Sequence, residues 1–249
     1  AGKSHTVTGI TAGTYTMHEV VAPNGYTVTT DIKFTIDKNG KVSGDSNNDS
    51  KTSEVSETKV IMKDDVTSVS FSKTDLGGTE IGGAKIQILA SNGKVASDKD
   101  NNKLEWTSEA DKTKVITGLA AGTYTMHEDT APDGYNKATD ITFTIGTDGK
   151  VTSDALKNDV VTMTDTLTAF DVTVSKTDLT TSKELPGAVL KVTTDAEGKN
   201  IVNDAKTSEA LTWASTTDSK VVHLTMGTYY LTETTAPYGY YKAETIKFT

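Results

Sequence analysis

The chain contains no cysteine, so no disulfide can brace it. Small β domains of secreted proteins often depend on such links, and their absence leaves open whether another covalent link replaces them. Proline occurs only 4 times, and aromatic residues make up 6% of the 249 residues. No apolar run is long enough to cross a bilayer. The net charge of -9 argues against a nucleic-acid partner and against an anionic membrane surface.

One motif is written three times in the chain. Each copy opens with Gly-Thr-Tyr, alternates for several residues and closes on Ala-Pro-x-Gly-Tyr, at 13–26, 122–135 and 227–240. Strict alternation predicts a half-buried strand, and Pro-x-Gly predicts the turn that ends it. A carboxylate directed toward a core is costly unless it has a partner. Yet every copy places a glutamate on the face of its large apolar residues, namely Glu19, Glu128 and Glu233.

The copies lie about a hundred residues apart, which is too long for a solenoid repeat and predicts a string of separate small domains. A composition rich in Thr, Val and Gly, without a long helical period, predicts all-β modules. Residues 66–168 are expected to form one complete module. Residues 1–65 correspond to the C-terminal part of a first module, and residues 169–249 to the N-terminal part of a third. We expect the chain to be a window from a longer array.

Two further alternating strands direct ionisable residues toward the core. The first strand of the middle module ends in Lys73, which shares a face with two apolar residues, and the third module repeats this strand with Lys176. The last strand of the middle module ends in Asp165 at the same inward parity, and the first module repeats it with Asp64. A polar run at 43–54 is read as a loop.

The middle module therefore carries a candidate reactive site. The first and last strands of a sandwich can lie side by side, which would bring Lys73 and Asp165 into contact with Glu128 beside them. Burial disfavours charge, so it raises the pKa of a carboxyl group and lowers that of an amine. A neutral amine held against a protonated carboxylic acid can attack it, lose water and form an amide. The second carboxyl would polarise the reacting one and shuttle protons.

Simpler interpretations of these residues stand beside the reactive one. The same three residues could form a buried ion-pair cluster that never reacts. His18 and His127 fall on the opposite face from the glutamates and are expected in solvent, while Trp106 and Trp213 are expected in the core. No metal site is expected, because the hairpin turns lack the alternating acidic ligands of a calcium loop. No catalytic or cofactor-binding motif is present either, so neither a cofactor nor a turnover enzyme is expected.

Three stretches of the chain resemble a known family. They are Phe-Ser-Lys-Thr-Asp at 71–75, the Tyr-x-Met-x-Glu strand with its Ala-Pro-x-Gly-Tyr turn, and the Met-x-Asp closing strand. They are similar to the B-type repeat domains, called CnaB or SpaA-type, of Gram-positive collagen adhesins and pilins. The likeness covers essentially the whole chain. It implies tandem inverse immunoglobulin-like, prealbumin-like β-sandwiches of about seven strands, with a self-formed Lys–Asn or Lys–Asp isopeptide bond.

The resemblance also implies roles for individual residues. Lys73 would be the amine, Asp165 the acceptor and Glu128 the catalyst. Aspartate is one of the family's two acceptor variants. Neither a Leu-Pro-x-Thr-Gly sorting signal nor a Tyr-Pro-Lys-Asn pilin motif occurs, so a backbone-pilin role is not supported. The first module lacks the lysine strand and the third lacks the acceptor strand, so they keep only the pairs Glu19 with Asp64 and Lys176 with Glu233.

Two classes of function remain, and an enzyme with turnover is a distant third. The favoured one is a structural stalk of an extracellular, cell-wall-anchored adhesin or pilus-like fibre. Its partners would be neighbouring modules of the same array and a distal adhesive domain. The alternative is that the repeats themselves bind a host or cell-wall ligand. Core and turn positions repeat while 43–54, 96–102 and 195–204 differ, which favours the stalk, because a binding repeat should repeat a surface constellation.

Overall fold

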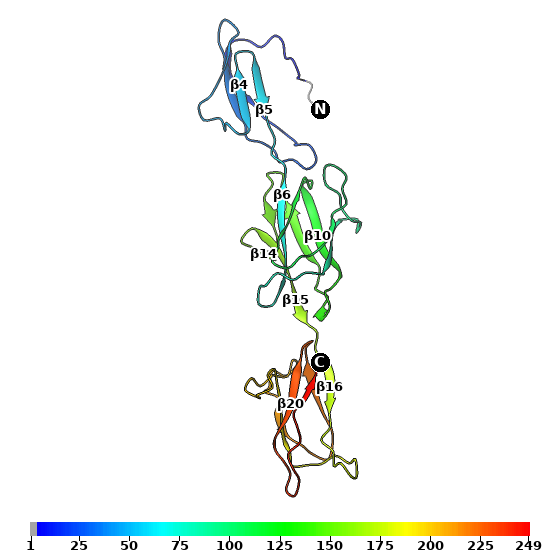
Figure 1. The fold of residues 1–249 in the computed structure, drawn as a ribbon. Coiled ribbons are helices and arrows are strands. Elements are labelled where there is room, and N and C mark those ends of the chain that lie inside the picture. Colours follow the sequence, from blue (N-terminus) through cyan, green and yellow to red (C-terminus); the bar gives the residue numbers. More distant parts are fainter. Residues whose placement is uncertain (1–3) are drawn as a thin grey trace. The chain divides into compact units, whose positions relative to one another are not determined.

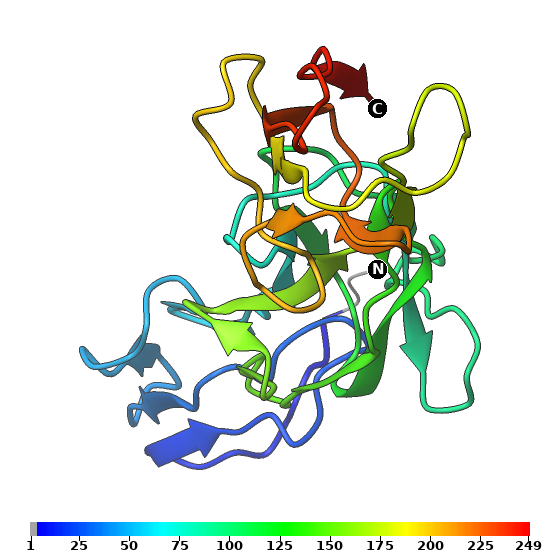
Figure 2. The same ribbon diagram turned by 90° about the horizontal axis from the view of Figure 1, so that it is seen from below.

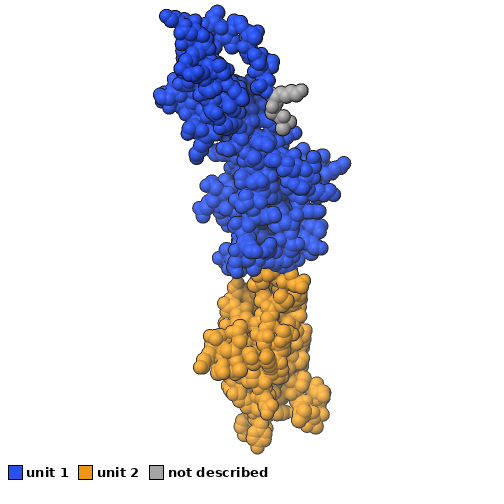
Figure 3. All heavy atoms as spheres, turned by 45° about the horizontal axis from the view of Figure 1, so that its top comes forward, with its two compact units in different colours: residues 1–132, 137–165 blue, residues 133–136, 166–249 orange. Residues whose placement is uncertain are grey.

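The computed structural model describes residues 4–249, which contain strands and turns but no helix. The prediction of an all-β fold is therefore confirmed. Two compact units are distinguished (Figure 3). The first comprises Ala1–Pro132 and Lys137–Asp165, and the second comprises Asp133–Asn136 and Thr166–Thr249. Residues Asp133–Asn136 thus group with the segment that begins at Thr166.

The middle module is a sandwich of two sheets (Figures 1 and 2). One sheet has the order β13-β12-β10-β7-β8, and the other has the order β11-β15-β6-β9, with β14 paired to β15. Several strands are only two residues long, so the module holds more strands than the expected seven. The strands are β6 (Ser68–Asp75), β7 (Lys85–Ala90), β8 (Glu105–Thr107), β9 (Lys114–Thr117), β10 (Gly122–Thr130), β11 (Tyr135–Asn136), β12 (Ile141–Ile145), β13 (Val151–Thr152), β14 (Leu156–Lys157) and β15 (Val160–Leu167).

The core of this sandwich is made by the inward residues of both sheets. Phe71 on β6 meets Phe143 on β12 edge to face, with ring centroids 5.2 Å apart. Met126 on β10 and Met163 on β15 are fully buried in the same cluster. Burying one such side chain stabilises the fold by about 1.5–3 kcal/mol. Successive residues of a strand point to opposite faces of the sheet, so every second residue of each strand points into this core.

The pairing of β15 with β6 decides where the ends of the module meet. It is parallel, whereas every other pairing between strands of residues 4–249 is antiparallel. A parallel pair needs a long crossover connection. Here that connection is nearly the whole module, since β6 is its first strand and β15 its last. The expectation that the first and last strands lie side by side is confirmed.

The residues before Val66 form two small sheets. One has the order β1-β2-β3 and the other pairs β4 with β5. The expected loop at 43–54 is wrong at both ends, because β3 runs to Gly44 and β4 begins at Ser53. Polar residues enter these short strands because pairing uses backbone groups, which every residue except proline can supply. The strands are β1 (Gly13–Met17), β2 (Ile32–Ile36), β3 (Val42–Gly44), β4 (Ser53–Ser56) and β5 (Lys59–Met62).

The second unit is built around a core of its own. One sheet pairs β16 with β19, and the other has the order β18-β17-β20-β21. Leu190 and Val192 of one sheet and Val222 and Leu224 of the other are buried in one cluster. The strands are β16 (Phe170–Val174), β17 (Val189–Thr193), β18 (Thr212–Ala214), β19 (Lys220–Leu224), β20 (Tyr229–Thr235) and β21 (Ile246–Phe248).

Candidate functional site

Lys73 and Asp165 meet inside the middle sandwich. Lys73 lies on β6 and Asp165 on β15, and both side chains are buried. The Nζ atom of Lys73 donates to Oδ1 of Asp165. In the parallel register Lys73 is level with Met163, so Asp165 stands two residues further along β15 on the same face. A flexible lysine side chain bridges this diagonal easily.

Glu128 completes a buried triad with these two residues. It lies on β10 of the facing sheet and is fully buried. Its Oε2 accepts a hydrogen bond of 2.7 Å from the backbone N–H of Ala138. This bond leaves Oε1 directed at Lys73, 3.1 Å from Nζ. One carboxylate oxygen is thus anchored by the backbone, and the other faces the amine.

Two carboxylate oxygens of the triad lack a hydrogen bond. Oε1 of Glu128 and Oδ2 of Asp165 are buried and have no hydrogen-bond partner among the described residues. A buried polar atom without a partner costs about 1–3 kcal/mol. A proton shared between Oε1 of Glu128 and Oδ2 of Asp165 would relieve this cost, because a protonated carboxyl group donates one hydrogen bond.

Electrostatics favour that protonated form of Asp165. Burial raises the pKa of Asp165, and the neighbouring Glu128 carboxyl raises it further, while contact with Lys73 opposes the shift. The net direction is upward, because removing a carboxylate from water costs more than one imperfect ion pair returns. The site therefore holds an amine against a carboxyl group biased toward its acid form, with a second carboxyl in contact.

The first module keeps part of this arrangement. Oε2 of Glu19 accepts a 2.9 Å hydrogen bond from the backbone N–H of Thr29, the same ten-residue step as in the triad. Asp64 lies beside Glu19, and its pKa is raised by burial and by that glutamate. Met17, on the inward face, is 38% exposed because no lysine strand covers it among the described residues. Asp64 and Glu19 therefore lie together here without a lysine beside them.

The third module keeps the complementary part. Lys176 lies just after β16, and its Nζ is 3.5 Å from Oε1 of Glu233 on β20. Oε2 of Glu233 accepts a 2.5 Å bond from the N–H of Ala243, again ten residues along. No strand pairs with the outer edge of β16 within residues 4–249. The Lys176 side chain is accordingly 17% exposed, against 2% for Lys73.

Two supporting residues were missed in the sequence. Oε2 of Glu80 accepts a 3.0 Å hydrogen bond from the backbone N–H of Lys73 and so holds the end of β6. Glu184 does the same for Lys176 at 3.1 Å. A signal was present, because both glutamates stand immediately before an apolar-x-Gly-Ala turn, Ile81 to Ala84 and Leu185 to Ala188. These glutamates therefore hold the backbone of the lysine, not its amine.

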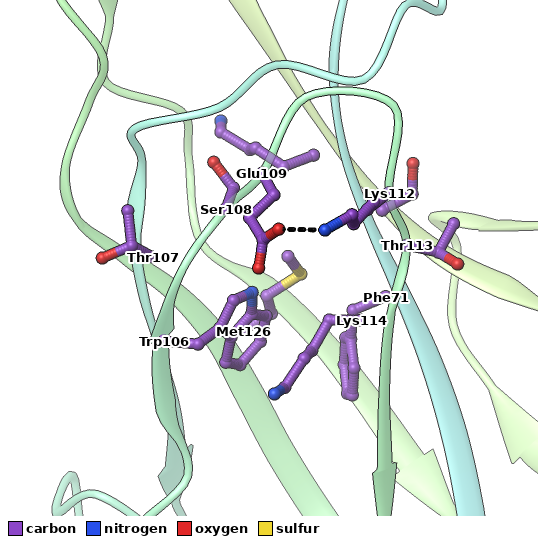
Figure 4. Close-up of a pocket in the computed structure, with 11 residues that line it drawn as sticks. Phe71, Trp106, Thr107, Ser108, Glu109, Lys112, Thr113, Lys114 and Met126 are labelled. Atoms are coloured by element: carbon purple, nitrogen blue, oxygen red, sulfur yellow. Dashed lines mark hydrogen bonds and ion pairs between the residues drawn. The ribbon is translucent and has the colours of Figure 1, made fainter.

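A hollow that has Lys73 in its lining opens beside the triad. Figure 4 draws the residues that line it. Its volume is about 300 Å³, and Phe71, Trp106 and Met126 form its apolar wall. Lys112 and Glu109 form an ion pair across its rim. The third module has a matching hollow of about 340 Å³, lined by Lys176, Glu184, Trp213 and Ser215 among other residues.

Trp106 packs against the core of the middle module and Trp213 against that of the third module. Each tryptophan also lines the hollow of its own module. His18, the residue after β1, is exposed and contacts Asp31, and His127 on β10 contacts Asp140 in the same way. Within residues 4–249 no cluster of His, Cys, Asp and Glu has the form of a metal site. None of the described residues lies in a helix that could span a membrane.

Comparison with known proteins assigns this chain to a family. The SpaA model, described as a prealbumin-like fold domain, matches residues 1–50, 67–159 and 170–249. The Bacillus anthracis TIE protein matches with a TM-score of 0.52 and 20% identity, covering 95% of this chain and 39% of its own. A streptococcal ancillary pilin matches with a TM-score of 0.32, 18% identity and coverage of 96% and 71%. A C-terminal fragment of the pilus adhesin SpaC from Lactobacillus rhamnosus GG matches with a TM-score of 0.37 and 23% identity. That match covers 64% of this chain and 76% of the fragment.

The structure matches and the family model support different conclusions about this chain. A search of the curated proteins finds no match. The chain spans 39% of the TIE protein's length, and at these identities the structural likeness concerns the fold. The family model is the stronger evidence for a family, because its three matched segments leave out only residues 51–66 and 160–169. The resemblance drawn from the motifs is confirmed: the chain belongs to the family of SpaA prealbumin-like fold domains.

Proposed function

We propose that this chain is part of a structural stalk of a Gram-positive surface adhesin or pilus-like fibre. Its middle module would be locked by a self-formed isopeptide bond between Lys73 and Asp165. The observation that carries the proposal is the buried triad, in which the Lys73 amine contacts the Asp165 carboxyl group and Glu128 faces both. The family's fold is compatible with an extended, load-bearing array.

The covalent step is a balanced condensation. The neutral amine of Lys73 attacks Cγ of the protonated Asp165 carboxyl group and forms a C–N bond. One C–O bond breaks, and the hydroxyl leaves as water with a proton from the amine. Glu128 would accept that proton and return it to the leaving oxygen. No oxidant, nucleotide or metal is needed, and the reaction occurs once per molecule, so the chain is not an enzyme with turnover.

The test of this proposal is the intact mass of the natively folded chain. One bond should lower the mass by one water molecule relative to the sequence, since only the middle module holds all three residues. Proteolysis should also release a branched peptide that joins the Lys73 and Asp165 segments. The Lys73→Arg variant serves as the control and should have its full sequence mass. A native chain with its full sequence mass would show that the cluster is only an ion-pair network.

The stalk proposal includes a location and partners. We propose an extracellular, cell-wall-anchored protein in which neighbouring modules of the array are the direct partners and a distal domain is adhesive. The absence of cysteine agrees with this setting, because an amide would supply the covalent brace that a disulfide supplies elsewhere. Unlike a disulfide, an amide is not reduced by thiols.

One observation favours the second candidate, in which the repeats bind a ligand. The hollows beside Lys73 and Lys176 are lined by corresponding tryptophan and serine residues. The test is isothermal titration calorimetry of the chain with soluble peptidoglycan fragments, with a Trp106→Phe, Trp213→Phe variant as the control. A saturable change that the control loses would support binding, and a flat titration would count against this class of ligand.

A further inference from the structure

A histidine and an aspartate meet just beyond the paired part of β10 and β12. The backbone pairing of these strands ends at Met126 and Ile141. One position further along both segments, Nδ1 of His127 lies 2.7 Å from Oδ1 of Asp140. The ring nitrogen is the donor, because an ionised carboxylate only accepts hydrogen bonds. The pair therefore extends the contact between the two segments by one step, with side chains in place of backbone groups.

The same step occurs in the other two copies of the motif. In the first module, His18 and Asp31 stand one position beyond the last pair of β1 with β2, and Nδ1 lies 2.5 Å from Oδ1. In the third module, Thr232 and Thr245 stand one position beyond the last pair of β20 with β21, and their hydroxyl oxygens are 3.2 Å apart. The side chains differ while the contact is kept, which indicates that the contact itself matters.

Each pair stands beside the anchor of a glutamate. Glu128 follows His127 on β10 and points to the opposite face, where its Oε2 accepts the backbone N–H of Ala138. Residues 137–140 belong to no strand, and among the described residues two hydrogen bonds tie them to β10, one on each face. All three copies share these steps, with 10 residues between glutamate and anchor and 13 between the paired side chains.

The two bonds have different strengths and complementary effects. The bond to Glu128 is part-buried and has a charged acceptor, whereas Asp140 is exposed, so its pair with His127 contributes little to global stability. A segment held on one face only can rotate about its own axis and turn the Ala138 N–H away from the core. A second bond on the outer face opposes that rotation. Because Ala138 fixes one oxygen of Glu128, the outer bond also affects the direction of the other oxygen.

An ordinary cross-strand pair is available for comparison on the same face of β10. The hydroxyls of Thr123 and Thr144 lie 2.9 Å apart at the other end of the paired region. Such a pair stabilises the sheet and is remote from the Ala138 anchor. It therefore separates a general contribution to strand pairing from a specific effect on the anchor.

We propose that His127 and Asp140 are positioning residues for the condensation. They form a latch that holds residues 137–140 against β10, and through the Ala138 anchor the latch orients the Glu128 carboxyl group toward the Lys73 amine. The latch itself contacts none of the reacting atoms. Its effect on the rate of condensation rests on the proposed isopeptide function, while its effect on the Ala138 anchor does not.

The anchor is tested by hydrogen exchange of the Ala138 amide, measured by NMR on the 249-residue chain. His127→Ala and Asp140→Ala each remove the latch and should speed this exchange roughly two- to fivefold, the range expected for a partly exposed ion pair. The double variant His127→Thr, Asp140→Thr copies the pair of the third module and should restore slow exchange. Thr123→Val is the matched control and should leave Ala138 unchanged.

The Ala243 amide is the internal reference in every spectrum, because its own glutamate and threonine pair are intact. An Ala138 amide that exchanges equally fast in the native chain and in both single variants would overturn the latch.

The role in the reaction is tested by the rate at which refolding protein loses water, followed by mass. Both single variants should slow this loss up to about fivefold, and the double threonine variant should restore it. Circular dichroism should show the same folding rate in all of them, which a merely structural role would not predict. Native-speed loss of water in the single variants would overturn the positioning role. A native chain that never loses water would contradict the isopeptide proposal alone, since the exchange test needs no bond.

Discussion

At the scale of the residue, the site separates two tasks between the oxygens of one glutamate. Oε2 of Glu128 is held by the backbone N–H of Ala138, and Oε1 faces the Lys73 amine, where the proposed proton transfer would use it. Glu19 and Glu233 are anchored in the same way, at Thr29 and Ala243. The anchor fixes the rotamer, so the free oxygen is positioned before any reaction begins. This division suggests a substitution that removes the chemistry and keeps the anchor.

Glu128→Gln should fold and fail to form the bond. The amide oxygen can still accept from Ala138, but the side chain can no longer accept and return a proton. We expect the intact mass to equal the sequence mass of the variant. Glu233→Gln is the matched control and should still show the loss of one water, because its module has no acceptor strand within the chain. Normal bond formation in Glu128→Gln would remove the catalytic role assigned to Glu128.

The raised pKa of Asp165 predicts how the rate of bond formation depends on pH. The acid form reacts, and burial lets it persist above the range near pH 4 where an ordinary aspartate ionises. The rate should therefore stay high above pH 4 and fall as the pH rises through the raised value. The measurement dilutes unfolded inclusion-body protein into buffers of graded pH and follows the loss of water by mass. Circular dichroism under the same conditions separates slow folding from slow chemistry.

A rate that declines already near pH 4 would contradict this assignment. It would mean that Asp165 ionises as if it were exposed, and the contribution of burial would then have been overstated.

At the scale of the element, the parallel pair β6 and β15 is the critical contact. These strands are the first and last of the module, and a bond between Lys73 and Asp165 would close a loop spanning 92 positions. Loop closure acts mainly on the unfolded chain, because the constrained chain has fewer conformations to gain when it unfolds. The facing β10 then contributes Glu128 from the other sheet, so the site requires both layers.

Asp165→Ala should lower the stability of the middle module by about 4–5 kcal/mol, the chain-entropy estimate for a loop of this length. Guanidinium unfolding monitored at Trp106 measures the change. Part of any loss could arise because Lys73 is left buried without a partner. The double variant Lys73→Met, Asp165→Ala removes that charge as well as the bond. If the double variant is as stable as the native chain, the bond contributes nothing measurable.

At the scale of the whole molecule, the proposed stalk role would require the chain to carry load from one end to the other. Tension along the chain enters the middle module through β6 and leaves through β15. A covalent bond between these strands would pass the load from one to the other, and the residues between them would not be stretched. The remaining strands would serve to exclude water from the triad and to hold it in register.

Single-molecule pulling tests this load path. The native middle module should add no contour length from the residues between Lys73 and Asp165. In Asp165→Ala the same residues should extend by roughly 300 Å, at about 3.3–3.6 Å per residue. The flanking segments, which lack a complete triad within this chain, provide an internal reference in both proteins. Equal extension in the two proteins would leave the stalk without its mechanical basis and would favour the ligand-binding alternative.

The sequence by itself determined the all-β class, the repeated strands and the side of each strand that faces the core. Alternation is a local property, so the inward parity of Lys73, Glu128 and Asp165 could be read without knowing any partner strand. A local pattern cannot reveal strands that form only through pairing with distant residues. The short strands at Val42–Gly44 and Ser53–Ser56 were missed because backbone pairing, and not side-chain pattern, creates them.

Tertiary structure alone decided which residues meet. That Asp165 contacts Lys73 across 92 positions follows from the parallel register of β15 on β6, which no local pattern encodes. The same holds for the Ala138 anchor and for Glu80 behind the lysine strand. The upward shift of the Asp165 pKa depends on how completely both sheets exclude water from the carboxyl group. Burial of that kind is a sum over distant segments, so it exists only once the chain has folded.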